Sequence, residues 1–101
     1  MDELSDDRAL FSMSVASEMS GVKPPMLRLY EQKGLLKPHR TAGGTRRYSR
    51  HELDRVGQIT SLLAAGLNLA GVDHVLRLRA ENHLLRGEVE RLRALRRSAG
   101  G

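Results

Sequence analysis

The sequence PPMLRLYEQKGLL occupies residues 24–36, and RTAGGTRRYS follows at residues 40–49. Proline is tolerated in the first turn of a helix, where backbone N–H groups lack intrahelical partners, so Pro24 predicts a helix start. Gly34 is expected to end that helix, whose inward-facing side chains recur at helical spacing: Met26, Leu27 and Tyr30. The pair Gly43-Gly44, set between short runs rich in Arg, Thr and Tyr, predicts a β-hairpin. Together the two stretches predict a helix followed by a basic hairpin, or wing.

A shorter helix is expected upstream of this pair of elements. Ser12 or Ser14 can cap it, it extends through Ser20, and Gly21 ends it because glycine tolerates a left-handed backbone. Its expected inward face consists of Val15, Ala16 and Met19. Two short helices joined by a glycine-containing turn form a helix-turn-helix, which the hairpin extends to a winged form.

Downstream of the wing, apolar residues at helical spacing predict a helix over residues 50–65. Ser49 is placed to cap it, and Glu52 stands three residues later, as in a capping box. Gly66 is expected to end this helix, and Asn68 can cap the next one. The apolar face of that next helix includes Leu69, Val72, Val75 and Leu76.

The last part of the chain carries a heptad repeat. Its apolar positions alternate three and four residues apart and include one polar residue, which in coiled coils fixes register: Val75, Leu78, Asn82, Leu85, Val89 and Leu92. We interpret these residues as a dimerisation seam. The alternative is an amphipathic helix that packs on its own domain.

The expected fold is therefore mainly α with a small β-hairpin: a winged helix-turn-helix followed by a dimerising coiled-coil helix. The domain boundaries follow from composition and periodicity. We expect an acidic disordered tail over residues 1–10, the DNA-binding domain over 11–79, the coiled coil over 80–98 and a short tail over 99–101.

The charge of the chain is distributed unevenly. Its formal net charge is +5, but residues 1–9 carry four acidic side chains against one Arg. Residues 23–50 carry eight Lys or Arg against Glu31 alone, a local net charge of +7. A concentrated basic block is typical of proteins that bind a polyanion, although a solvated basic face would look the same by charge alone.

Several classes of function are disfavoured by what the sequence does not contain. There are no cysteines, so disulfides and thiolate metal sites are excluded. The four histidines show no i,i+4 pairing and are expected at the surface, and no catalytic or phosphate-binding motif is found. We therefore expect no enzyme activity, no metal and no cofactor. No signal peptide, membrane span or separate ligand domain is expected, which predicts a cytoplasmic, nucleoid-associated protein.

Three segments together resemble the MerR family of transcription regulators. The stretch from Val15-Ala16 to Gly21-Val22 is similar to that family's first helix and turn. Residues 24–36 are similar to its recognition helix, with the pattern Leu-Arg-x-Tyr-x-x-x-Gly-Leu, and Arg46-Arg47-Tyr48 resembles the end of its wing. The resemblance covers residues 11 to about 80. Within the family, residues 40–49 and 66–72 look most like the heat-shock repressors of the HspR group.

This resemblance implies a homodimer that binds inverted repeats in double-stranded DNA, with phosphate contacts from Arg28 and Tyr30. For the HspR group it also implies operators upstream of chaperone operons and a DnaK-type chaperone as co-repressor. The sequence departs from the family pattern at Pro25 and Met26, because neither side chain can hydrogen-bond a base edge. Base readout is then expected from Lys23, Arg28 or the wing, or from DNA shape. Arg46 and Arg47 are expected in or beside the minor groove.

The predicted function is thus a sequence-specific DNA-binding regulator, a repressor that acts as a homodimer. The predicted DNA-binding residues are Ser14, Lys23, Arg28, Tyr30, Arg40, Thr45, Arg46, Arg47 and Tyr48. The alternatives are a coiled-coil protein-interaction adaptor, or a MerR-type activator without its own ligand domain, for which RNA polymerase would be a partner. Charges flanking the heptad seam favour a parallel pair, but the spacing of successive major grooves and the resemblance favour an antiparallel pair, which we expect.

Overall fold

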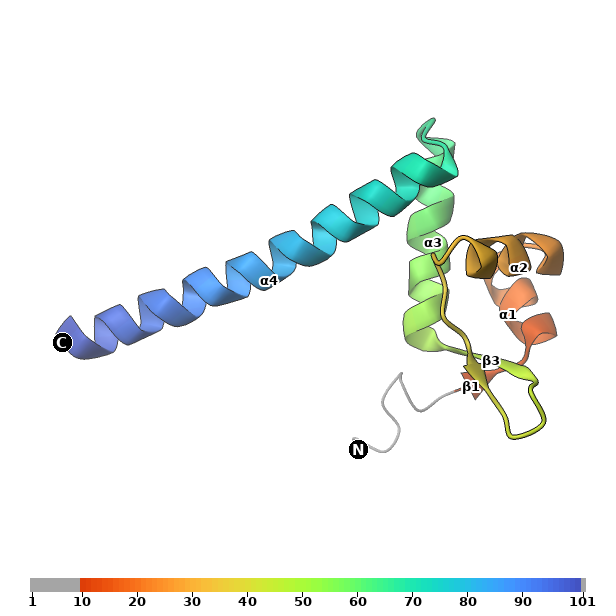
Figure 1. The fold of residues 1–101 in the computed structure, drawn as a ribbon, viewed down its shortest axis with the longest axis horizontal. Coiled ribbons are helices and arrows are strands. Elements are labelled where there is room, and N and C mark those ends of the chain that lie inside the picture. The colour runs from red at the N-terminus through yellow and green to blue at the C-terminus, as the bar shows by residue number, and fades with distance from the viewer. Residues whose placement is uncertain (1–9, 101) are drawn as a thin grey trace. The chain divides into compact units, whose positions relative to one another are not determined.

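The computed structural model describes residues 10–100, and apart from the strand β1 its elements follow the order predicted from the sequence (Figure 1). The chain is mainly helical, with a small sheet. Its helices and strands are β1 (Leu10–Phe11), α1 (Met13–Ser20), α2 (Pro24–Gln32), β2 (His39–Arg40), β3 (Arg46–Ser49), α3 (Arg50–Ala64) and α4 (Leu69–Gly100). The chain divides between Leu67 and Asn68 into two compact units.

The helix-turn-helix forms where the capping residues predict it. Ser12 accepts a hydrogen bond from the Val15 N–H at 3.3 Å and so caps α1. Gly21 ends α1 with a φ of +73°, a left-handed conformation that residues with a Cβ adopt at a cost. Ala16 is buried, whereas Val15 and Met19 are 41% and 51% exposed. The predicted inward face of α1 is therefore narrower than expected and centres on one small residue.

The small sheet contains one strand more than the predicted hairpin. Strands β2 and β3 pair antiparallel, with His39 opposite Arg47 and Arg40 opposite Arg46. On the other side of β3, β1 pairs with Leu10 opposite Ser49. Leu10 was expected in the tail and is instead in a strand. The strand forms because it pairs with β3, which lies far along the chain. The rest of the predicted tail, residues 1–9, lies outside the described residues.

The first unit has an aliphatic core completed by two tyrosines. Helix α1 contacts α2, α3 and β3, and α3 also contacts β3. The core residues of this unit are Ala16, Leu27, Tyr30, Leu35, Leu36, Tyr48, Val56 and Ile59. Met26 is 39% exposed, so it does not take the inward position predicted for it.

Helix α3 begins with the predicted capping box. The Ser49 hydroxyl accepts a hydrogen bond from the Glu52 N–H at 3.2 Å, and the Glu52 carboxylate accepts one from the Ser49 N–H at 3.1 Å. Both residues are buried, so these bonds satisfy polar groups that water does not reach. The box fixes the junction between β3 and α3.

Replacing Ser49 by Ala should lower the free energy of unfolding by about 1 kcal/mol, the usual effect of losing an N-cap side chain. Urea unfolding at a fixed protein concentration measures the change. Ser61→Ala is the control, because Ser61 is exposed in the same helix. Equal stabilities of the two variants would contradict a role for the capping box.

The second unit is one long helix. Asn68 caps α4 by accepting a hydrogen bond from the Gly71 N–H at 2.8 Å, as predicted. The helix runs without interruption through the boundary expected at residues 79 and 80, and it continues to Gly100 rather than ending at 98. Val72 and Leu76 are buried near its N-terminal end. In the described residues no helix is long and apolar enough to cross a membrane.

Candidate nucleic-acid interface

The first turn of α2 has no free backbone N–H group that could bind an anion. Pro24 and Pro25 occupy its first two positions and carry no N–H, and the N–H groups of Met26 and Leu27 donate to the Lys23 carbonyl at 2.9 and 3.1 Å. None of these four residues therefore offers a backbone N–H to an anion, in contrast to many helix N-termini. Lys23 is exposed at the N-cap and makes no capping hydrogen bond, so its ammonium group is the donor available there.

Arg28 of α2 lies beside the first turn of α1, which contains Met13 and Ser14. Arg28 is exposed on α2, and its Nη1 lies 3.5 Å from the Met13 sulfur, a weak acceptor on α1. Ser14 is exposed in the first turn of α1. Within residues 10–100 no acidic side chain forms an ion pair with Lys23, Arg28 or Arg47. Their positive charges therefore remain available to a polyanion.

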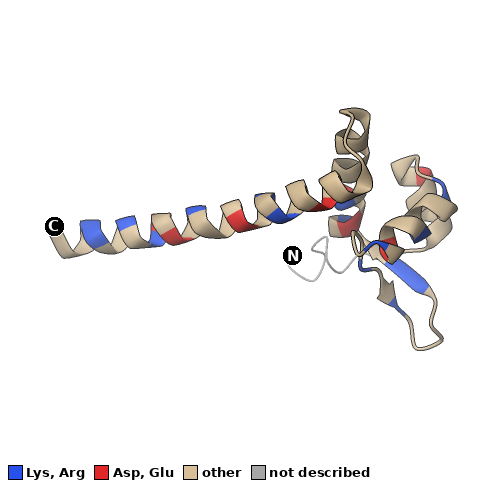
Figure 2. Ribbon diagram, turned by 45° about the horizontal axis from the view of Figure 1, so that its top comes forward, with Lys and Arg blue, Asp and Glu red and all other residues tan. Residues whose placement is uncertain are grey.

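The wing is held in shape by hydrogen bonds within its turn. The Thr41 N–H donates to the Thr45 carbonyl at 2.9 Å, and the Gly44 N–H donates to the Thr41 carbonyl at 2.9 Å. Gly44 has a φ of +85°, which the tight turn requires. Thr45 is exposed at this turn, and Arg47 is partly exposed, with its Nη1 2.9 Å from the Arg46 carbonyl. The blue of Lys and Arg marks both wing strands in Figure 2.

Glu31 of α2 pairs with both wing strands. Its Oε2 lies 2.6 Å from Nη2 of Arg40, and its Oε1 lies 2.6 Å from Nε of Arg46. Burial alone would raise the pKa of Glu31, but the hydrogen bonds and charges of Arg46 and Arg40 outweigh it and lower the pKa below its usual 4.5. A depressed carboxyl pKa adds stability that is present at neutral pH and is lost as the pH falls through the lowered pKa. The pairs are therefore intact at neutral pH.

Both tyrosines predicted to contact DNA lie in the core. Tyr48 is 0% exposed, and its hydroxyl is buried without a hydrogen-bond partner. Tyr30 is 3% exposed. Burial raises the pKa of both phenols. The assignment of Tyr48 as a DNA contact is corrected, because its side chain is fully buried in a strand that contacts α1 and α3. Tyr30 retains only a small exposed edge.

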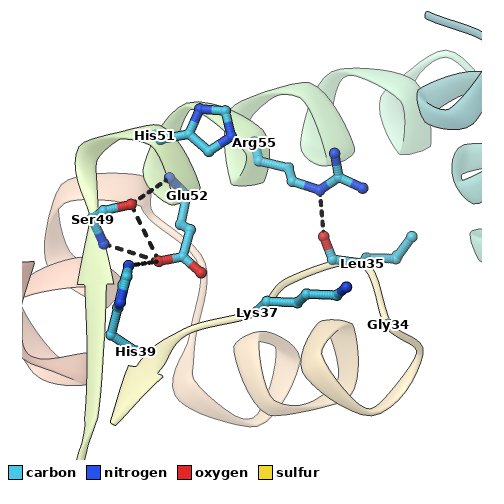
Figure 3. A pocket seen from close by; sticks show the side chains of 8 residues that line it. All are labelled: Gly34, Leu35, Lys37, His39, Ser49, His51, Glu52 and Arg55. Atoms are coloured by element: carbon cyan, nitrogen blue, oxygen red, sulfur yellow. Dashed lines mark hydrogen bonds and ion pairs between the residues drawn. The ribbon is translucent and has the colours of Figure 1, made fainter. Parts of the chain in front are cut away.

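A cavity of about 580 Å³ opens at the base of the wing (Figure 3). Its lining contains four basic side chains and the capping box: Gly34, Leu35, Lys37, His39, Ser49, His51, Glu52 and Arg55. His39 Nε2 lies 4.0 Å from the nearer Glu52 oxygen, and Arg55 donates to the Leu35 carbonyl (Figure 3). The other Glu52 oxygen is buried without a partner. The sequence predicted the capping box but not this cavity. Lys37 and His39 are distant from the box in sequence, and only the folded chain brings them beside it.

The predicted dimerisation residues form one exposed stripe along α4. Leu78, Leu85, Val89 and Leu92 are 54%, 66%, 44% and 51% exposed, Asn82 is exposed and Val75 is partly buried. Arg79, Arg86 and Arg93 line shallow hollows beside this stripe. Leu84 and Leu95, which the heptad does not include, are also exposed. In residues 10–100 no group of His, Cys, Asp and Glu residues could hold a metal ion.

Comparisons with known proteins agree with this architecture. The chain is 40% identical over 77 residues to a Streptomyces coelicolor protein named heat shock protein HspR, which covers 75% of this chain and 51% of that protein. It is 34% identical over 67 residues to the HTH-type transcriptional regulator GlnR of Bacillus anthracis, covering 66% and 52%. The chain therefore spans about half the length of the curated relatives that it matches.

Solved structures show the same fold. HiNmlR, a MerR family regulator lacking the sensor domain and bound to promoter DNA, matches with a TM-score of 0.67 at 23% identity, over 79% of this chain and 66% of that one. A MerR family transcriptional regulator from Bacillus cereus matches with a TM-score of 0.64 at 24% identity, over 86% and 75%. The sequence model of the MerR HTH family regulatory proteins matches residues 11–79. Because this match covers more than half of the sequence, the chain belongs to the MerR HTH family of regulatory proteins.

Proposed function

We propose that this protein binds double-stranded DNA and regulates transcription, with the helix-turn-helix and the wing as its DNA-binding surface. The observation that carries the proposal is a set of cations on these two elements that have no acidic partner within residues 10–100: Lys23, Arg28 and Arg47. Arg28 and Ser14 are assigned to phosphates beside the recognition helix, and Arg47 and Thr45 to the minor groove at the wing. Lys23 is the side chain best placed to reach a base edge.

The proposal includes a homodimer that pairs through α4. A single helix that exposes Leu78, Leu85, Val89 and Leu92 leaves an apolar stripe in water, and a second copy of the same stripe can cover it. Residues 75–97 of α4 span about 34 Å at 1.5 Å per residue. That length is close to one turn of DNA, which is the separation of two half-sites read on one face. An antiparallel pair would therefore suit an inverted repeat.

Repression of heat-shock or chaperone genes is the regulatory role we propose, since the name of the Streptomyces relative refers to heat shock. A DnaK-type chaperone or RNA polymerase is the protein partner that this role would involve. With chromosomal DNA as the ligand, the protein would act in the cytoplasm at the nucleoid. A purified transcription assay tests the sign of regulation, and stimulation of RNA polymerase by this protein alone would contradict repression.

A mobility-shift experiment on a random duplex across a salt series tests the proposed function itself. Binding should weaken steeply as salt rises, because released counterions drive phosphate binding. A protein-interaction adaptor, the competing function, would shift the duplex only at low salt, through its net positive charge, and would lose the complex at physiological salt. Footprinting on the organism's own DNA would then give the operator.

Neutralising the acidic side chains of residues 1–9 should tighten DNA binding at low salt. Asp2, Glu3, Asp6 and Asp7 repel the phosphates in this proposal, and the effect should fade as salt screens it. The measurement compares the wild type with a variant carrying Asn or Gln at these four positions. Weaker binding by the variant would show that the segment makes a contact of its own.

A further inference from the structure

One carboxylate of the recognition helix holds both strands of the wing. Arg40 and Arg46 stand opposite each other in the ladder of β2 and β3, and each donates to a different oxygen of Glu31 at 2.6 Å. Arg40 also donates through Nη1 to the Gly44 carbonyl at 3.0 Å, within the wing turn. The side chain of Glu31 thus connects α2 to the strands and, through Arg40, to the turn.

The Arg46–Glu31 pair is more sheltered from water than an ordinary surface ion pair, whereas the Arg40 side chain of the other pair is 45% exposed. The Glu31 side chain is 21% exposed, and that of Arg46 is 30% exposed. Partial burial and the use of both carboxylate oxygens strengthen such contacts relative to a single exposed pair. The two arginines carry part of the basic block of residues 23–50, but each already faces a carboxylate.

We propose that Glu31 is a positioning residue for DNA binding, which fixes the wing on α2 so that both elements meet the duplex as one rigid surface. Arg40 and Arg46 serve this attachment, and Arg47 and Thr45 make the wing's contacts with DNA. The inference rests on the proposed DNA binding. A wing that is ordered before binding avoids the entropy that a loose hairpin would lose on the duplex.

Removing the charge of Glu31 tests this role, because two accounts predict changes of opposite sign. If Arg40 and Arg46 bound phosphates, Glu31→Gln would free them, tighten binding and steepen the salt dependence. A positioning role predicts the reverse: roughly tenfold weaker binding with an unchanged salt slope. Glu31→Asp, which keeps the charge, should recover part of the affinity. Glu18→Gln is the control, because Glu18 is exposed on α1 and loses the same charge.

Hydrogen exchange without DNA provides a second readout. In Glu31→Gln the N–H groups of Thr41 and Gly44 should exchange faster than in the wild type, while those of α3 keep their rates. Tighter DNA binding, a steeper salt slope or unchanged exchange in the wing would each overturn the positioning role. If the wild-type protein bound no DNA, the proposed function would fail, and the exchange rates would still decide whether Glu31 orders the wing.

Discussion

The double variant Arg28→Ala/Arg47→Ala should bind duplex DNA on the order of 100-fold more weakly than the wild type at about 0.1 M salt. Each arginine lacks an acidic partner in the part of the chain described, so each can form a charge-assisted contact with a phosphate. Such contacts contribute about 1.5 kcal/mol or more apiece, and 1.4 kcal/mol corresponds to a factor of ten. The slope of affinity against salt should fall by about one for each arginine removed.

Lys37→Ala is a control that removes one positive charge outside the proposed interface, and it matches each single variant, Arg28→Ala and Arg47→Ala, in charge. Lys37 is exposed and lines the cavity at the base of the wing. It follows the C-terminal end of α2, whereas the proposed DNA contact Lys23 lies at the N-terminal end of that helix. Its removal should alter affinity only through the long-range field, and the salt slope should stay close to that of the wild type. An unchanged affinity and an unchanged salt slope in the double variant would show that the recognition helix and the wing do not contact DNA.

The local features of the fold could be predicted because they depend on short-range chemistry. Caps at Ser12, Ser49 and Asn68 and the turn at Gly44 each follow from one side chain and its near neighbours. Strand β1 could not be predicted in this way. A two-residue strand has no periodicity, and Leu10 is extended because Ser49 lies beside it in the folded sheet.

The sequence predicted which charged residues the candidate site contains, but it did not predict which of them pair with one another. Counting charges identified the basic block, but the count treated Glu31 only as one negative charge within it. The structure shows that this charge pairs with Arg40 and Arg46, two residues from separate strands. A motif likewise says nothing of burial, so Tyr48 was assigned to DNA while its side chain is 0% exposed. The ion pairs of Glu31 and the burial of Tyr48 both depend on residues distant in sequence, which charge counts and motifs do not show.

Leu85→Asp should abolish the proposed homodimer and lower the affinity for a full inverted repeat by about 10²–10⁴-fold, the usual gain from linking two binding modules. Leu85 is 66% exposed in the single chain and lies in the middle of the apolar stripe on α4. An aspartate there would place an unpaired charge in the seam between two copies. Analytical ultracentrifugation should show a monomer. The control is Arg77→Asp. Arg77 is exposed on α4 and lies outside the apolar stripe, so this variant should leave the dimer intact.

The orientation of the pair can be fixed by disulfide trapping, since the natural chain has no cysteine. In an antiparallel pair centred on the seam, Val75 of one copy lies beside Leu92 of the other, within reach of a disulfide. The single variants Val75→Cys and Leu92→Cys should therefore cross-link when mixed and not when each is oxidised alone. A parallel pair gives the opposite pattern, because each cysteine then faces its own equivalent. Cross-linking of Val75→Cys with itself would refute the antiparallel arrangement, and with it the separation of half-sites that α4 would set.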